Sequence, residues 1–168
     1  MTVEEALFSS WDRQCRVIDN LLGRFRPEDL HLKPDEDGWT IAFHLAHVHG
    51  VRRFWHMNAA GLEEPVGASL YAATGDDWAD WVPTYDLQTI RARLAESGAL
   101  VRDWAREALA AGVTKAGNYD HPVLYLQHMI WHEGWHVGLI MLALRRGGQE
   151  PPEEWEDAHV WDLWRLPG

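Results

Sequence analysis

The sequence predicts one all-α domain over residues 1–168, folded as a four-helix bundle with a long loop between the second and third helices. Four segments repeat apolar residues every three or four positions, which is the spacing of one face of a helix. Stretches rich in glycine and proline separate these segments, and no segment alternates as a half-buried strand does. A chain of 168 residues fits one domain of ordinary size. Four amphipathic helices with one long connection typically pack as a bundle.

The first helix is expected from about Val3 to Phe25. Gly23 near its end and Pro27 just after it are stop signals. Its apolar residues recur on one face, which contains Leu7, Trp11, Cys15, Ile18, Leu22 and Phe25.

The second helix is expected from about Thr40 to Ala60. Thr40 is a good N-cap after the turn-forming residues 34–38, and Gly61 marks the C-terminal stop. The inward face of this helix carries His44 and His47. His49 and His56 are expected to point roughly the opposite way.

Residues 61–83 form the long loop, which contains Trp78 and Trp81. A connection of this length inside a compact domain is often functional. The third helix is expected to start at Thr84 or Asp86 and to run to Ala111, because Gly112 follows.

The fourth helix is expected to begin at the N-cap Asp120, with Pro122 in its first turn, and to end at Arg146 before two glycines. One broad face carries His121, Tyr125, His128, His132, Trp135, His136 and Leu139. The C-terminal tail is aromatic, so we expect it to pack back onto the body or onto a second subunit. Its tryptophans are Trp155, Trp161 and Trp164.

The composition excludes several classes of partner. The formal net charge is -11, from 15 Lys and Arg against 26 Asp and Glu, so nucleic acid and anionic membrane surfaces are disfavoured. No apolar stretch is long enough to span a bilayer, and the opening residues lack a signal-peptide pattern. Cys15 is the single cysteine, which rules out an intrachain disulfide and suits a reducing compartment. We expect a cytoplasmic protein.

The fourth segment carries the clearest chemical motif. His132 and His136 are spaced i, i+4, which places two imidazoles on one helix face, able to share one metal ion. With Glu133 they match the HExxH pattern of zinc proteases. The metzincin extension fails, because Leu139 and Leu142 occupy its positions. A thermolysin-like third ligand from Glu153, Glu154 or Glu156 stays open, although no strand precedes the motif.

A third ligand from the second helix is favoured. His44 and His47 lie on its inward face, and inward residues of two helices can meet in the core of a bundle. Several imidazoles brought into a core without partners would be costly to bury. The pattern therefore predicts a site for one divalent metal ion held by His132 and His136 together with His44 or His47.

Two segments resemble the DinB/YfiT-like superfamily. Residues 38–47 are similar to its second-helix signature, in which a metal-binding His follows a Trp by eight residues, as His47 follows Trp39. Residues 126–144 are similar to its fourth-helix HxxxH signature. Leu139 departs from the pattern, since many members have Gln in that neighbourhood. This departure removes a polar group near the site.

The resemblance implies a four-helix bundle that is often a homodimer, in which His47, His132 and His136 hold one metal ion, often zinc or nickel. It also implies a transferase that joins a low-molecular-weight thiol, such as bacillithiol or mycothiol, to a small electrophile, with the metal holding the thiol as thiolate. Trp55, Trp78, Trp81 and Trp135 are expected to line the electrophile pocket. The alternative for each of them is packing in the core. Arg52 and Arg53 are candidates to bind a carboxylate of the thiol, or else surface charges.

Two alternatives remain. One is a metal-dependent hydrolase with Glu133 as general base. Glu133 lies about 100° around the helix from His132, so a position facing a neighbouring helix or solvent is favoured over the site. The other alternative is a non-catalytic metal-binding protein of a stress response.

Overall fold

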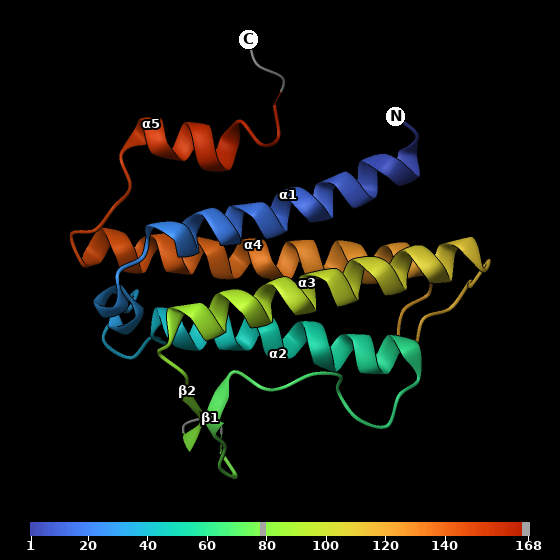
Figure 1. Ribbon diagram of the computed structural model, residues 1–168, viewed down its shortest axis with the longest axis horizontal. Coiled ribbons are helices and arrows are strands. Elements are labelled where there is room, and N and C mark those ends of the chain that lie inside the picture. The colour runs from blue at the N-terminus through green and yellow to red at the C-terminus, as the bar shows by residue number, and fades with distance from the viewer. Residues whose placement is uncertain (78–79, 166–168) are drawn as a thin grey trace.

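The computed structural model describes residues 1–77 and 80–165, which fold into four long helices and a helical tail (Figure 1). The predicted all-α class is confirmed. The long helices are α1 (Val3–Arg24), α2 (Ile41–Ala60), α3 (Leu87–Ala110) and α4 (Pro122–Arg146). A short 3-10 helix, η1 (Pro27–His31), follows α1, and the tail contains α5 (Glu153–Glu156) and the π-helical turn η3 (Asp157–Trp161).

Local capping explains where the helices begin. Thr2 and Glu5 form a capping box at α1, and the Thr40 side chain accepts a hydrogen bond from the backbone N–H of Phe43 at the start of α2. The expected cap of α4 was Asp120, but the cap is His121. Its Nδ1 accepts a hydrogen bond from the N–H of Val123 at 3.2 Å. Pro122 then occupies the first turn, where its missing N–H costs nothing.

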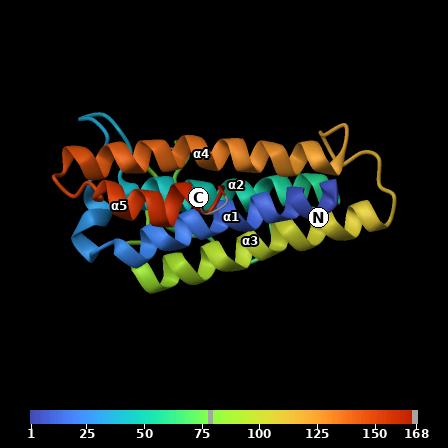
Figure 2. The same ribbon diagram turned by 90° about the horizontal axis from the view of Figure 1, so that it is seen from above.

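The long helices lie side by side, with α1 and α2 on opposite sides of the pair α3 and α4 (Figures 1 and 2). α2 packs against both α3 and α4, and α1 packs against the same two helices. Two apolar clusters fill the interior, one around Leu21 and Ile41 and the other around Trp11 and Tyr125. The contact between α2 and α4 is the one that brings the histidines of the two helices together.

The connection after α2 contains a small antiparallel hairpin, β1 (Tyr71–Ala73) and β2 (Val82–Pro83). The expectation that the chain has no strand is therefore wrong at this point. Strands this short contain no alternation that a sequence pattern could reveal. Tyr71 anchors the hairpin, because its ring lies edge-on to Phe43 of α2 and to Trp81.

The tail packs back onto the body, as its tryptophans predicted. The side-chain amide of Asn20 donates a hydrogen bond to the carbonyl of His159 at 2.8 Å, and Arg24 lies over the ring of Trp155. Trp155 also packs against the apolar cluster around Leu21. These contacts join η3 and α5 to α1.

Within the ranges that the structure describes, no helix combines the length and the apolar character needed to cross a bilayer.

Candidate metal centre

Three histidines from two helices converge at the contact between α2 and α4. One ring nitrogen of each of His47, His132 and His136 lies within 4.8 Å of the others. His47 comes from α2, and the other two are one turn apart on α4. The three residues predicted as ligands are therefore brought together, and the cluster can hold one metal ion.

The spacing of the nitrogens fits such an ion. Nε2 of His132 lies 3.2 Å from Nε2 of His136. Two nitrogens bound tetrahedrally to one zinc ion at about 2.0–2.1 Å would lie about 3.3 Å apart. Nδ1 of His132 is buried and makes no hydrogen bond within the described chain, so the contact of this ring with a protein group is at Nε2.

His44 is a fourth histidine at the cluster. Its Nδ1 lies 2.9 Å from Nδ1 of His136, and both side chains are buried. For Nε2 of His136 to bind a metal ion, its proton must sit on Nδ1 and be donated to His44. With His136 as the donor, this contact would hold its ring in the orientation that leaves Nε2 as a ligand.

The environment keeps these rings neutral. Burial lowers the pKa of His47, and burial together with the charge of His47 lowers the pKa of His44 and of His132 to about 4. The pKa of His136 falls to about 2 through burial and the neighbouring histidines. A neutral imidazole is the form that binds a metal ion.

A cleft of about 550 Å³ opens onto the cluster. The loop before α2 forms one side of it and α4 the other. Trp39 covers the histidines, with its ring centroid 5.1 Å from that of His47 and 5.5 Å from that of His44. Trp131 and Trp135 line the side formed by α4. Leu139 also lines the cleft, so the departure from the family pattern falls at the site itself.

Glu133 lies outside this cleft. Its side chain is buried, and its two oxygens accept hydrogen bonds from Nε and Nη2 of Arg52 at 2.6 and 2.8 Å. Arg52 also donates to the carbonyl of Leu94 at 2.7 Å. Burial alone would lower the pKa of Arg52, but the charge and hydrogen bonds of Glu133 outweigh this effect and raise it. Glu133 therefore faces α2, and the structure does not bring it together with the histidines.

Other candidates also lie elsewhere. Trp55 packs in the cluster around Trp11, and its ring meets Tyr119 edge-on. Nε1 of Trp81 donates to the carbonyl of Gly75 in the hairpin connection. Of the four tryptophans proposed for the pocket, Trp135 lines it, and Trp78 lies outside the described residues.

Neither arginine proposed for the thiol cofactor lines the cleft. Arg52 is the buried partner of Glu133, and Arg53 donates to the carbonyls of Val66 and Gly67 in the following loop. The glutamates considered as a thermolysin-like ligand belong to the tail near α1 rather than to the histidine cluster.

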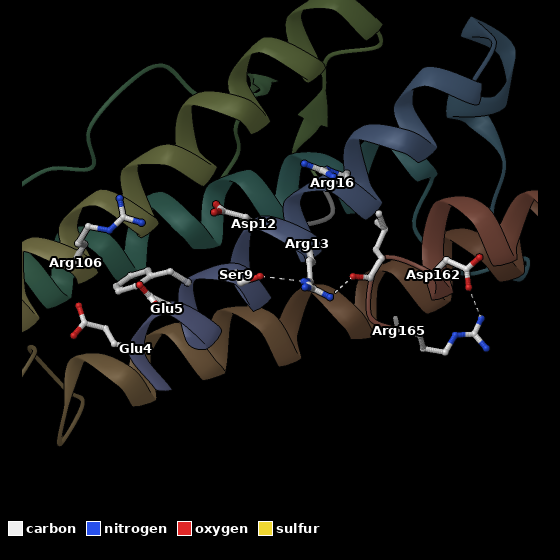
Figure 3. A pocket seen from close by; sticks show the side chains of 11 residues that line it. Glu4, Glu5, Ser9, Asp12, Arg13, Arg16, Arg106, Asp162 and Arg165 are labelled. Atoms are coloured by element: carbon white, nitrogen blue, oxygen red, sulfur yellow. Dashed lines mark hydrogen bonds and ion pairs between the residues drawn. The ribbon is translucent and has the colours of Figure 1, made fainter. Parts of the chain in front are cut away.

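A second cleft, of about 730 Å³, lies between α1, the end of α3 and the tail (Figure 3). Some of its polar groups pair with one another. Arg13 donates to the Ser9 hydroxyl and to the Leu163 carbonyl, and Arg165 pairs with Asp162. It contains no histidine among its described lining residues, so the chemistry of metal binding belongs to the smaller cleft.

Two wall residues, Trp39 and Trp131, were not proposed as pocket residues from the sequence. Trp39 directly precedes the N-cap of α2, and Trp131 directly precedes the HxxxH motif, so proximity to the motifs was the available signal. His44 was noted on the correct face, but its bond to His136 depends on the rotation of two helices.

Comparison with known proteins identifies the family of this chain. The family model of the DinB superfamily matches residues 10–140, which include α2 and both histidines of the HxxxH motif. No curated protein and no solved structure matches the chain. Because the match covers most of the chain, the protein belongs to the DinB superfamily.

Proposed function

We propose that this protein is a divalent-metal-dependent transferase that joins a low-molecular-weight thiol to a small electrophile. Zinc and nickel are the proposed metals, and bacillithiol and mycothiol are the proposed thiols. The observation that carries the proposal is the set of three neutral imidazoles at a cleft with aromatic walls.

The donor set favours a reactive centre over a purely structural one. Structural zinc sites are usually closed by four protein ligands, whereas catalytic sites use three and keep one position for a small molecule. The cluster offers His47, His132 and His136, and no further His, Cys, Asp or Glu joins it within the described chain. A divalent metal ion bound there would lower the pKa of a thiol or water molecule that it binds.

The tryptophans of the cleft would bind the electrophile and exclude water from the histidines. Trp39 covers the histidines, and Trp131 and Trp135 give the cleft an apolar wall for the electrophile. In the proposed reaction the thiol sulfur forms a bond to the electrophilic carbon, the thiol loses its proton, and the leaving group departs with its bonding electrons. Holding both reactants in one cleft favours this step by proximity.

The hydrolase alternative requires Glu133 as a general base near the substrate. Both oxygens of Glu133 are engaged by Arg52 in the interior, so its position gives that alternative no support. A non-catalytic metal-binding role requires only the histidine cluster, and activity measurements separate it from the transferase.

The test is conjugation of monobromobimane to bacillithiol or mycothiol by protein loaded with zinc or nickel. Loaded wild-type protein is expected to accelerate loss of both reactants, and metal-stripped protein is not. His136→Ala should abolish the acceleration, while His56→Gln, on the opposite face of α2, should retain it.

Metal content is measured on every sample, so that loss of metal is distinguished from loss of activity. If loaded protein conjugates neither thiol faster than the free metal ion does, the transferase proposal fails and the metal-binding role remains. If it instead hydrolyses esters or amides and Glu133→Gln abolishes this with metal retained, the hydrolase replaces the transferase.

A further inference from the structure

The described walls of the histidine cleft carry aromatic rings and two carboxylates but no lysine or arginine. From this we infer that the electrophile, the substrate placed against the tryptophan wall, carries an organic cation such as a substituted ammonium group. The inference rests on the proposed function and deepens it, because it names the class of molecule that enters the same cleft.

The aromatic surface is the first observation. Trp131 and Trp135 are 66% and 61% exposed, and their ring centroids lie 6.1 Å apart on the rim of the cleft. Trp39, 38% exposed, forms the opposite wall. Large exposed rings gathered at a cleft typically mark a binding surface. The faces of tryptophan are the preferred partners of organic cations, and aromatic cages bind quaternary ammonium groups.

The charges of the cleft are the second observation. Asp35 and Asp37 are the acidic residues among the described residues that line the cleft, and no lysine or arginine is among them. Two basic residues lie close to the loop that contains Asp35 and Asp37, but neither lines the cleft. Lys33 is exposed beside it, and Arg146 donates to the carbonyl of Pro34 at 2.6 Å. Apart from the proposed metal ion and the thiolate bound to it, the formal charges at the mouth are therefore negative, which favours a cation there.

No lysine or arginine among the described lining residues could pair with an anionic group of the electrophile. Recognition of a carboxylate or phosphate typically uses arginine or lysine. Arg52 is buried against Glu133, and Arg53 is bound to loop carbonyls, so neither is available in the cleft.

The depth of the groups suggests how a cationic substrate would lie. His44 and His136 are buried at the floor, whereas Trp131 and Trp135 are largely exposed at the rim. A cation on the rim would leave the floor of the cleft to the reacting group.

The test compares choline with 3,3-dimethylbutan-1-ol, a neutral molecule of the same shape, by isothermal titration calorimetry. Zinc-loaded and metal-free wild-type proteins are both titrated, and zinc uptake is measured first on the same preparation. Choline is expected to bind at least about tenfold more tightly, which corresponds to about 1.4 kcal/mol. Trp135→Leu, or Asp35→Asn combined with Asp37→Asn, should remove most of that preference.

Trp161→Leu is the control, because Trp161 is also exposed but lies on the tail outside this cleft. It should leave the preference unchanged. Equal binding of the two molecules, tighter binding of the alcohol, or binding of neither would overturn the inference while leaving a zinc-binding protein intact. If wild-type protein takes up no zinc, the proposed function fails, and the choline titration of the metal-free protein still decides the cation preference.

Discussion

Nδ1 of His44 lies 2.9 Å from Nδ1 of His136, so one buried histidine of α2 holds a proposed metal ligand of α4. Outer hydrogen bonds of this kind fix the tautomer and orientation of a ligating imidazole. We therefore expect His44 to act as a positioning residue, because it lies beside the three histidines that could hold a metal ion and is not one of them.

His44→Ala should weaken zinc binding by about 10- to 100-fold while leaving one ion bound per chain. The reason is that His136 loses the partner that orients its ring. His44→Gln, whose side-chain oxygen can accept the same hydrogen bond, should restore part of the affinity. Titration calorimetry with competing chelator measures both variants. Unchanged affinity in His44→Ala would remove the positioning role, and complete loss of binding would make His44 a ligand.

The Arg52–Glu133 pair should matter for stability far more than a surface pair. Its side chains are 2% and 1% exposed, so Glu133→Gln would leave a guanidinium buried without its counter-charge. We expect this change to lower the free energy of unfolding by about 3–5 kcal/mol, as measured by urea denaturation. Replacing both residues together, with Arg52→Met and Glu133→Leu, should recover much of the loss.

The matched control for that experiment is Asp19→Asn, which breaks the exposed pair between Asp19 and Arg91. Exposed pairs contribute about 0–1 kcal/mol, so this variant should unfold close to wild type. A cost of Glu133→Gln no larger than that of Asp19→Asn would contradict the buried-pair account.

The stability of metal-free protein should fall as the pH drops from about 6.5 towards 4. Burial lowers the pKa of His44, His49 and His132 to about 4, below the ordinary value near 6.5. Between these values the unfolded chain binds protons that the folded chain does not, so protonation favours unfolding. Each such proton contributes a slope of about 1.4 kcal/mol per pH unit. Urea unfolding from pH 7.5 to 4.5 in chelator measures the trend, and constant or rising stability towards acid would disprove it.

Much of the helical framework could be predicted from the sequence, because its signals are local. Thr40 and Gly61 bound α2 as the residue pattern indicated. The cap of α4 was misplaced by one residue, since Asp120 and His121 both offer an acceptor to the first turn. The hairpin at Tyr71 escaped prediction because its strands are too short to show a period.

The site was predictable where one helix carries the pattern, and harder to predict where two helices must meet. The i, i+4 spacing of His132 and His136 is a local signal. Three other contacts depend on how α2 and α4 are rotated and aligned along their axes. They are the contact of His44 with His136, the packing of Trp39 on His47 and the ion pair of Glu133 with Arg52. A homodimer and a cytoplasmic location stay predictions.

The measurement that most directly tests the metal centre is a zinc titration of metal-stripped wild-type protein beside His47→Ala and the control His56→Ala. His56 is also a buried histidine of α2 but lies outside the cluster. We expect one zinc ion per chain in wild type and in His56→Ala, and affinity reduced at least about 100-fold in His47→Ala. A wild-type protein that takes up neither zinc nor nickel, or a His47→Ala variant that binds as tightly as wild type, would contradict a metal ion held between the two helices.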